Sequence, residues 1–265
     1  MSKSTKYTAK IPDADGIIHY TDDENAIWNT LITRQKAALP GEASQAYMDA
    51  LELLDFPEDR VPQCEEVSKV LREKTGWEVA PVPALINFPR FFGLLANKRF
   101  PAATFIRTRD ELDYLQEPDI FHELFGHTPH LTDPRFAAFT HAYGRAGVMA
   151  NQKDQAMLAR LYWFTVEFGL IDSGEGLRTY GAGIVSSIGE TQYALHSDKP
   201  VRKPFDPIDV LRTPYRIDIY QPVYFVLESF DQLFELAQQD LLGLINQARE
   251  LGMHEPLFPP PEKVA

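Results

Sequence analysis

Two histidines, His122 and His127, form a compact group of potential metal ligands in this sequence of 265 residues. They belong to the segment HELFGH, in which Glu123 places a carboxylate beside the first imidazole. Imidazole nitrogens and carboxylate oxygens are common protein ligands of zinc and non-haem iron. The segment therefore predicts one half of a mononuclear metal site, with His130 as the first substitute for either histidine.

The spacing of the two histidines constrains the backbone between them. On a straight α-helix, positions five apart point roughly 140° away from each other, so both side chains cannot face one ion. Gly126 is able to adopt the left-handed conformation that ends a helix, and Pro129 prevents the helix from resuming. We therefore expect His122 in the last turn of a helix and His127 just beyond it. The zinc-protease motif HExxH, with histidines four apart, is disfavoured.

Glu167 is the predicted third ligand. It lies within LYWFTVEFGLI (161–171), a segment that is apolar on all sides and predicts a helix buried inside the domain. A lone buried carboxylate costs several kcal/mol unless it is protonated, paired or metal-bound. Pairing with Arg160 or Arg178 is the structural alternative, but a shared metal would also complete the two-histidine site. Two histidines and one carboxylate suit non-haem Fe(II) enzymes, and zinc hydrolases also use them.

Composition limits the function classes. With 44% hydrophobic residues the chain is ordinary globular material, and its length fits one domain. The net charge of −12 argues against nucleic acid or an anionic membrane as partner. A single cysteine, Cys64, excludes an internal disulfide framework. Because no secretory signal and no run of 18 apolar residues occurs, we expect a cytoplasmic protein that does not span a membrane.

Apolar periodicity and the positions of glycine and proline predict an α+β fold that is mostly α-helical. Asp22 or Asp23 is the expected cap of the first helix. Further helices are expected at about 47–54, from 67 to a stop at Gly76, and at 136–148, 154–170 and 230–251, with short strands at 103–108 and 216–220. Residues 1–24 are predicted to form an irregular arm, 25–252 a single domain, and 253–265 a proline-rich tail.

Two further features could border the site. Arg107 lies near the end of the predicted strand at 103–108, where it is either solvated or held at a pocket wall to bind a carboxylate. The Gly- and Ser-rich segment 178–190 suits a loop that approaches a ligand closely. It contains no GxGxxG or P-loop pattern, so a nucleotide site is not indicated.

Three blocks of sequence carry a family resemblance. EPDIFHELFGHTP (117–129), LYWFTVEFGL (161–170) and YGAGIVSSIGE (180–190) resemble the catalytic core of the pterin-dependent aromatic amino acid hydroxylases. IRTRDELDYLQ and YQPVYFVLESF extend the likeness, which covers the chain from about Trp28 to Leu251. Within the family, the chain is most similar to the short bacterial members that act on phenylalanine. The resemblance implies a single catalytic domain of this type, without regulatory or tetramerisation segments, and therefore a monomer.

The resemblance also assigns roles to individual positions. The family's iron ligands fall on His122, His127 and Glu167, and its substrate-carboxylate arginine falls on Arg107. Other positions implied at the amino acid site are Thr108, Pro118, Trp163 and Ser186. Positions implied at the pterin are Leu85 and Ile86 through their backbone, Phe91 through ring stacking, and Glu123 through its carboxylate.

The implied activity is hydroxylation of L-phenylalanine to L-tyrosine with O2, a tetrahydropterin and Fe(II). Tyrosine-specific members have an acidic residue where this chain has Ile217, and tryptophan-specific members replace Trp163 with a smaller aromatic residue. Both positions favour phenylalanine, although a single pocket group shifts selectivity by only ~1 to 3 kcal/mol. The alternatives are a tryptophan or tyrosine hydroxylase, a zinc hydrolase with Glu123 as general base, and a scaffold that binds no metal.

Overall fold

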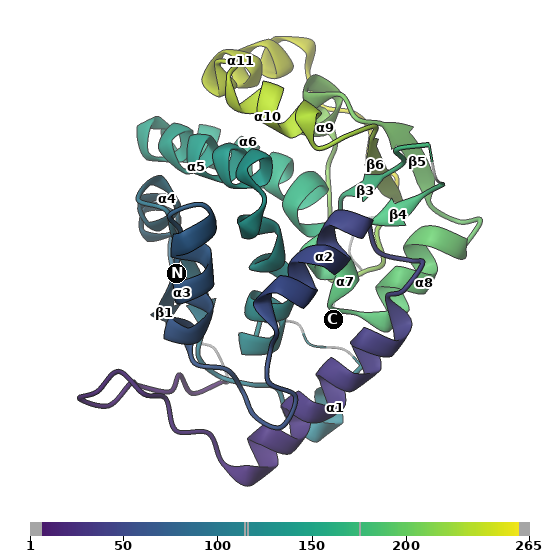
Figure 1. Ribbon diagram of the computed structural model, residues 1–265. Coiled ribbons are helices and arrows are strands. Elements are labelled where there is room, and N and C mark those ends of the chain that lie inside the picture. Colours follow the sequence, from purple (N-terminus) through teal and green to yellow (C-terminus); the bar gives the residue numbers. More distant parts are fainter. Residues whose placement is uncertain (1–6, 114, 116, 175, 260–265) are drawn as a thin grey trace, which may run out of the picture.

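The computed structural model describes residues 7–113, 115, 117–174 and 176–259. Helices dominate and the strands are short, which confirms the expected α+β, mostly helical class (Figure 1). The α-helices are α1 (Asp22–Ala38), α2 (Gln45–Leu54), α3 (Cys64–Lys74), α4 (Phe88–Ala96), α5 (Pro134–Met149), α6 (Gln152–Tyr162), α7 (Ala182–Val185), α8 (Ile188–His196), α9 (Pro207–Arg212), α10 (Asp231–Ala237) and α11 (Leu241–Leu251). Tighter or wider turns form η1 (Arg109–Glu111), η2 (His122–His127), η3 (Pro129–Thr132) and η4 (Trp163–Glu167).

The strands form two small sheets. β1 (Glu78–Val82) and β2 (Arg99–Ala103) pair in parallel. The second sheet has the order β4-β3-β6-β5, with β4 (Arg178–Thr179), β3 (Leu170–Ile171), β6 (Val223–Leu227) and β5 (Val201–Pro204). Only its β3–β4 pair is antiparallel. β6, an inner strand of this sheet, is largely buried, as its continuous apolar sequence VYFVL predicts.

The cap of the first helix lies just before the predicted positions. Thr21 is the N-cap of α1, and its side chain and that of Glu24 form a reciprocal capping box, so the predicted cap at Asp22 or Asp23 is wrong. The predicted arm is too long, because residues 22–24 belong to α1; residues 7–21 contain no helix or strand. The arm contacts the domain through Tyr20, whose hydroxyl donates a hydrogen bond to the Thr104 carbonyl at 2.9 Å. Residues 1–6 of the predicted arm and 260–265 of the predicted tail lie outside the described residues.

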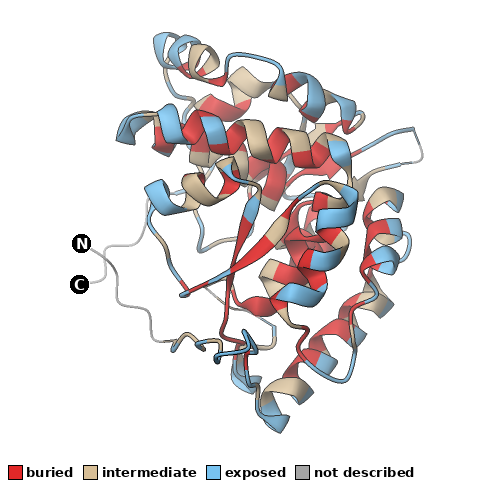
Figure 2. Cartoon of the chain, turned by 60° about the vertical axis from the view of Figure 1, so that its left-hand side comes forward, coloured by how far each residue is buried: buried red, intermediate tan, exposed pale blue. Residues whose placement is uncertain are grey.

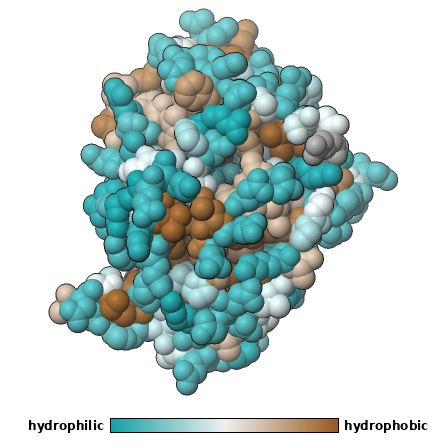
Figure 3. Space-filling view, viewed as in Figure 1, coloured by the Kyte–Doolittle hydropathy of each residue, from teal (hydrophilic) through white to brown (hydrophobic). Residues whose placement is uncertain are grey.

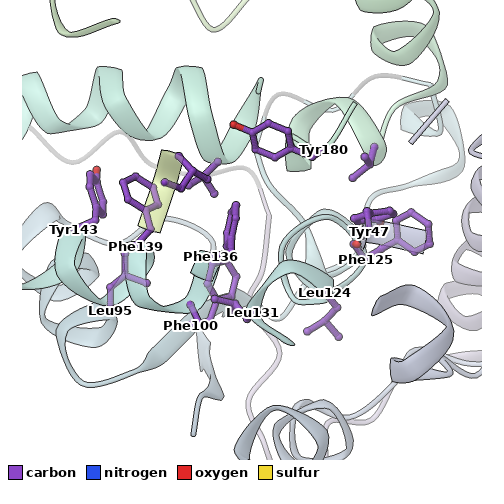
Figure 4. Packing of buried hydrophobic residues seen from close by; sticks show 14 of the residues in the cluster. Tyr47, Leu95, Phe100, Leu124, Phe125, Leu131, Phe136, Phe139, Tyr143 and Tyr180 are labelled. Atoms are coloured by element: carbon purple, nitrogen blue, oxygen red, sulfur yellow. Dashed lines mark hydrogen bonds between the residues drawn. The ribbon is translucent and has the colours of Figure 1, made fainter. Parts of the chain in front are cut away.

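Buried aromatic residues hold the central segment in place. The rings of Phe121 and Phe125 stack with centroids 4.9 Å apart, and Trp28 of α1 meets Phe121 edge to face at 5.4 Å. Tyr47 of α2 packs against Phe125 and donates its hydroxyl hydrogen to the Phe125 carbonyl at 2.7 Å (Figure 4). Each buried aromatic side chain removes roughly 150–250 Å² from water, which fixes the segment between Phe121 and Phe125 firmly.

Burial follows the helix faces, with red inner faces and pale blue outer ones (Figure 2). Helices α10 and α11 cover α5 and α6, and α1 runs diagonally along the opposite part of the molecule (Figure 1). Hydrophilic side chains cover most of the face shown in Figure 3, with one apolar group near its centre. Within the described ranges, no helix has the length and hydrophobicity needed to cross a bilayer.

The strand predicted at 103–108 is wrong. The observed strand β2 ends at Ala103, and the residues that follow are extended but pair with no neighbouring strand. Their backbone groups bond elsewhere: the Phe105 carbonyl accepts from the Ile120 N–H, and the Arg107 N–H donates to the Asp119 carboxylate. Because these partners come from a distant segment, the β-rich composition alone predicted a ladder that does not form.

The strand predicted at 216–220 is also wrong, because the strand there is β6, which starts at Val223. The Gln221 side chain donates to the carbonyls of Arg216 and Ile219, both at 3.0 Å. These bonds satisfy backbone acceptors that a strand would offer to a neighbour. Ile217, which was expected in a strand, is 56% exposed.

Two predicted helices are interrupted. The one expected at 154–170 is α6 up to Tyr162, after which η4 leads to β3. The one expected at 230–251 is two helices, α10 and α11, separated by residues 238–240. Leu236 before the break and Leu241 after it are both buried. The apolar periodicity of the sequence therefore continues across the break and gives no sign of it.

Candidate metal centre

His122 and His127 lie on one π-helical turn, η2. A π-helix bonds residue i to residue i+5, so positions five apart face the same side, whereas an α-helix separates them. The predicted helix end at Gly126 is therefore wrong: Gly126 lies inside the turn and has no positive φ. The wider turn, not a helix terminus, brings the two imidazoles together.

Gly126 is required for packing. A Cβ added there would lie 3.0 Å from the Ala182 carbonyl oxygen and 3.1 Å from the Ala182 Cβ of helix α7. This close approach lets α7 sit directly against the turn that carries the histidines. Gly126 is therefore needed because it has no side chain. The sequence predicted a different reason, its ability to adopt a left-handed backbone conformation.

Glu167 lies at the end of a second π-helical turn, η4. The Phe168 N–H closes this turn on the Trp163 carbonyl at 2.9 Å, an i to i+5 bond. Trp163 and Glu167 are thus the first and last residues of one turn, inserted between α6 and β3. The structure shows no arginine paired with Glu167 in the described part of the chain, so the ion pair with Arg160 or Arg178 is not formed.

The three predicted ligands converge. The Nε2 atoms of His122 and His127 are 3.1 Å apart. The two carboxylate oxygens of Glu167 lie 3.2 Å from the His127 Nε2 and 3.5 Å from the His122 Nε2. Glu123 is more distant, with its Oε2 4.0 Å from the His127 Nε2. Donor atoms of His122, Glu123 and His127 also lie within 4.8 Å of one another, so both carboxylates border the site.

Electrostatics distinguishes the two carboxylates. Burial alone would raise the pKa of Glu167, but His127 and His122 beside it lower the pKa below its ordinary value. Burial raises the pKa of Glu123 well above its ordinary value, and the nearby Glu167 raises it further. The two histidines therefore favour the ionised form of Glu167, whereas burial and the nearby Glu167 favour the protonated form of Glu123. Burial also lowers the pKa of His122 to about 4, which leaves a neutral imidazole.

This donor set fits a first-row divalent ion. Two donors that are each ~2.1 Å from an ion lie about 3.0 Å apart at a right angle and about 3.4 Å apart at a tetrahedral angle. The two Nε2 atoms are 3.1 Å apart, and the nearest Glu167 oxygen lies 3.2 Å from the Nε2 of His127 and 3.5 Å from that of His122, all close to this range. Neutral imidazoles and one carboxylate are the forms that ligate such a metal.

Ser186 fixes the tautomer of His122. The Ser186 hydroxyl donates to the Ala182 carbonyl at 2.7 Å and lies 3.0 Å from the His122 Nδ1. Because its only hydrogen is committed to that carbonyl, Ser186 accepts the Nδ1–H of His122. The Nε2 lone pair of His122 is then directed at the site. This contact supports the histidine ligand, whereas Ser186 had been expected at the amino acid.

Replacing Ser186 with alanine should weaken iron binding by about 10- to 100-fold, the usual effect of losing such a support. The expected loss arises because the His122 tautomer and ring orientation are no longer fixed. Titration of Fe(II) into the metal-free variant measures it. Serine 187 provides the control, because its hydroxyl caps α8 and accepts from the Glu190 N–H; Ser187→Ala should bind iron as the unsubstituted protein does.

Arg107 is buried, with only 6% exposure, so the solvated alternative is wrong. Its Nε and Nη2 both donate to the Asp119 carboxylate at 2.9 Å, which forms a bidentate pair. Asp119, which is fully buried, also accepts the backbone N–H groups of Arg107 and His122. One carboxylate therefore anchors both the arginine and the start of the histidine turn. No role had been predicted for Asp119.

The other predicted amino acid contacts lie around this pair. Thr108 is exposed, and its hydroxyl and backbone N–H both donate to Glu111. Pro118 is half-buried and directly precedes Asp119. These two positions remain predictions for substrate binding.

Trp163 is half-buried between two rings. Its ring centroid lies 4.5 Å from that of Phe168 and 4.7 Å from that of Tyr215. Its indole N–H donates to the Gln221 side-chain oxygen at 2.9 Å. The sequence offered no sign that Tyr215 and Gln221 contact this residue.

One predicted pterin position reaches the histidine turn through another ring. Phe91 of α4 meets Tyr162 edge to face at 5.4 Å, and the Tyr162 ring lies 6.1 Å from that of His127. Leu85 and Ile86 lie in the segment between β1 and α4, where Leu85 is 50% exposed. The roles of these positions at a pterin remain predictions.

Two residues left open by the sequence are structural. The His130 Nε2 is 2.6 Å from the Tyr180 carbonyl oxygen, and the ring stacks on Phe136, so this histidine is not a substitute ligand. Cys64 is buried at the start of α3, and burial raises the pKa of its thiol to about 12. Such a thiol is unreactive at neutral pH.

A buried acid behind the site predicts a pH-dependent stability. Burial raises the pKa of Glu190 from 4.5 to about 7, although the Tyr224 hydroxyl and the Gln221 N–H oppose the shift by donating to it. The folded chain therefore holds this proton more tightly than the unfolded chain, and its stabilisation is lost as pH rises through about 4.5 to 7.

We expect the free energy of unfolding to fall by about 2 to 3 kcal/mol more between pH 5 and 8 in the unsubstituted protein than in Glu190→Gln. Urea unfolding at the two pH values measures the difference. Parallel pH profiles for the two proteins would show that Glu190 has no raised pKa.

Known proteins are similar to this chain in sequence and in fold. Residues 1–243 match the family described as biopterin-dependent aromatic amino acid hydroxylase. A phenylalanine-4-hydroxylase of Pseudomonas aeruginosa is 56% identical over 97% of this chain and 98% of its own length. The apo structure of the cold-active phenylalanine hydroxylase from Colwellia psychrerythraea superposes with a TM-score of 0.93 at 53% identity, covering 94% of this chain and 97% of the other.

A phenylalanine hydroxylase from Chromobacterium violaceum, solved with bound oxidised Fe(III), matches with a TM-score of 0.88 at 43% identity and covers 96% of this chain and 92% of its own. These matches extend over nearly the whole chain, and they agree with the resemblance carried by the three sequence blocks. The zinc-hydrolase and metal-free scaffold alternatives receive no support from them. The chain belongs to the family of biopterin-dependent aromatic amino acid hydroxylases.

Proposed function

We propose that this chain hydroxylates L-phenylalanine to L-tyrosine, using O2 and a tetrahydropterin at a mononuclear Fe(II) held by His122, His127 and Glu167. The observation that carries the proposal is the convergence of the two Nε2 atoms and the Glu167 carboxylate within 3.1 to 3.5 Å of one another. The relatives named phenylalanine-4-hydroxylase at 56 and 54% identity support phenylalanine as the substrate.

Iron and tetrahydropterin, when bound, supply oxygen activation and the electrons for hydroxylation. His122 and His127 present their Nε2 atoms from one turn, and Glu167 adds a carboxylate from another. The remaining coordination positions are left to small molecules, as two-histidine, one-carboxylate sites require. We assign Glu167 no general-base role, because its carboxylate would hold the metal.

Arg107 binds the carboxylate of the amino acid. Two of its nitrogens are occupied by Asp119, but its Nη1 makes only a long, 3.5 Å contact with the Leu112 carbonyl. This nitrogen retains donor capacity for the substrate. Because Asp119 also accepts the His122 N–H, the carboxylate site and the metal site are held in a fixed relation.

Pro118 and Trp163 wall the aromatic ring of the substrate, with Thr108 and Ser186 at the border of the site. An apolar wall orients the ring and excludes water from the reacting atoms. Phe91 stacks on the pterin ring, the backbone at Leu85 and Ile86 bonds to it, and neutral Glu123 lies at its edge. A neutral carboxyl group can donate a hydrogen bond as well as accept one.

The small-molecule partners are therefore L-phenylalanine, O2 and the tetrahydropterin. The net charge of −12 opposes binding to nucleic acid or to anionic membrane surfaces. The proposal includes a cytoplasmic monomer, and the single, buried, free cysteine agrees with a reducing compartment.

The test is tyrosine formation from phenylalanine by purified protein with Fe(II), tetrahydropterin and O2, omitting each component in turn. We expect activity only when all are present, and phenylalanine to be preferred over tryptophan and tyrosine supplied at the same concentration. Preferred hydroxylation of tryptophan or tyrosine would replace the substrate assignment. A protein that binds iron but hydroxylates none of the three would refute the proposed function.

A further inference from the structure

Gln221 is a buried amide with every side-chain hydrogen-bonding group in use. It is 1% exposed, and its Oε1 accepts the indole N–H of Trp163 at 2.9 Å. Its Nε2 donates both hydrogens, to the carbonyls of Arg216 and Ile219, each at 3.0 Å. An amide satisfied in this way has one orientation, because any rotation leaves buried polar groups unpaired.

The backbone at Gln221 is anchored as firmly as its side chain. Its N–H donates to the Glu190 carboxylate of α8, which also accepts the Tyr224 hydroxyl at 2.5 Å from β6. Gln221 lies just before β6, between these two elements. The position of its Oε1 is therefore set by α8 and by the four-stranded sheet.

Trp163 depends on that oxygen for its orientation within the ring plane. Phe168 and Tyr215 pack against its ring, with interplanar angles of 39° and 22°. Such contacts fix the tilt of the indole plane. They do little to prevent the indole from rotating within that plane. The hydrogen bond from the indole N–H to Gln221 supplies that direction, and so fixes which edge of the indole faces the site.

We infer that Gln221 is a specificity-determining positioning residue, which holds Trp163 so that the pocket admits the phenylalanine ring and rejects a larger indole substrate. The inference rests on the proposed function and deepens it. Gln221 acts only through Trp163 and touches no substrate. Without this hydrogen bond, the Trp163 indole rotates in its own plane against Phe168 and Tyr215, and the pocket becomes wider.

The test compares hydroxylation of L-phenylalanine and L-tryptophan present together in one mixture. The ratio of the two products gives the ratio of the kcat/KM values, and it does not depend on the fraction of enzyme that is folded. Gln221→Met keeps the length of the side chain and removes its hydrogen bonds. We expect it to reduce the preference for phenylalanine by about ten-fold. Gln221→Asn, which retracts the amide by one carbon, should shift the ratio in the same direction.

Two further variants separate positioning from general loss of structure. Gln155 is a buried amide that donates to the Gly147 carbonyl at 3.0 Å, and it makes no hydrogen bond to Trp163; Gln155→Met should leave the product ratio unchanged. Trp163→Phe removes the indole N–H. In that background, Gln221→Met should produce no additional shift, because the group through which it acts is gone.

The inference is overturned if Gln221→Met and Gln221→Asn keep the unsubstituted product ratio. It is also overturned if Gln221→Met shifts the ratio equally in the Trp163→Phe background. If the unsubstituted protein hydroxylates neither amino acid, the proposed function itself fails. The assay of the unsubstituted protein alone reveals that outcome, so it cannot be confused with a failure of the inference about Gln221.

Discussion

Replacement of Glu167 with alanine is expected to abolish both iron retention and tyrosine formation. Glu167 is the only ionised carboxylate among the described groups within 3.5 Å of either histidine Nε2, and the two imidazoles alone provide no charge to balance the metal. Loss of a ligand from a three-residue site also leaves too few donors for stable binding. Iron content after desalting, together with tyrosine formation, measures the effect.

Glu123→Gln is the matched control for this prediction. Glu123 is the second carboxylate at the site, but it lies farther from His127, and burial raises its pKa and so favours its protonated form. The amide is close to a neutral carboxyl group in size and polarity, so iron should be retained, while the dependence of the rate on pterin concentration changes. If Glu167→Ala retains iron and Glu123→Gln loses it, the two carboxylates have been assigned in the wrong order.

Replacement of Arg107 with alanine is expected to raise the KM for phenylalanine by about 100-fold, with kcat and the KM for the pterin changed much less. A charge-assisted hydrogen bond to a buried carboxylate contributes roughly 1.5 to 3 kcal/mol, which corresponds to this factor. Steady-state kinetics with each substrate varied in turn measures it. An unchanged KM for phenylalanine would remove Arg107 from the substrate site.

The variant will also be less stable, because Asp119 loses its bidentate partner in a fully buried position. Breaking such a pair costs about 3 to 5 kcal/mol, so the kinetics should be measured well below the unfolding temperature. Arg109→Ala is the control. Arg109 is two residues away, exposed and paired with Asp23 at the surface, and its loss should leave the KM for phenylalanine unaltered.

The metal ligands could be predicted from the sequence because their chemistry is local. Burying two imidazoles and a carboxylate among apolar residues is costly unless they have partners. One metal ion bound by all three side chains offsets this cost. The π-helical turn that unites His122 and His127 could not be predicted. With α-helical geometry, the five-residue spacing predicts a helix end at Gly126, which the π-helical turn makes unnecessary.

The roles of residues that depend on partners elsewhere in the chain could not be predicted from the sequence either. Asp119 matters because it binds Arg107 and the His122 backbone together, and neither its neighbours nor its spacing indicate this. Gln221 matters because it reaches Trp163 from another part of the chain. Composition predicted strands at 103–108 and 216–220, but there the backbone bonds to side chains and distant loops, and no strand forms.

The most direct test of the central claim is a crystal structure of the protein loaded with Fe(II) and L-phenylalanine without oxygen, with anomalous diffraction collected at the iron edge. The account predicts one anomalous peak bonded to the Nε2 atoms of His122 and His127 and to the Glu167 carboxylate. It also predicts the amino acid carboxylate on Arg107 and its ring beside Trp163. An iron peak elsewhere, or an amino acid bound away from Arg107, would contradict the account.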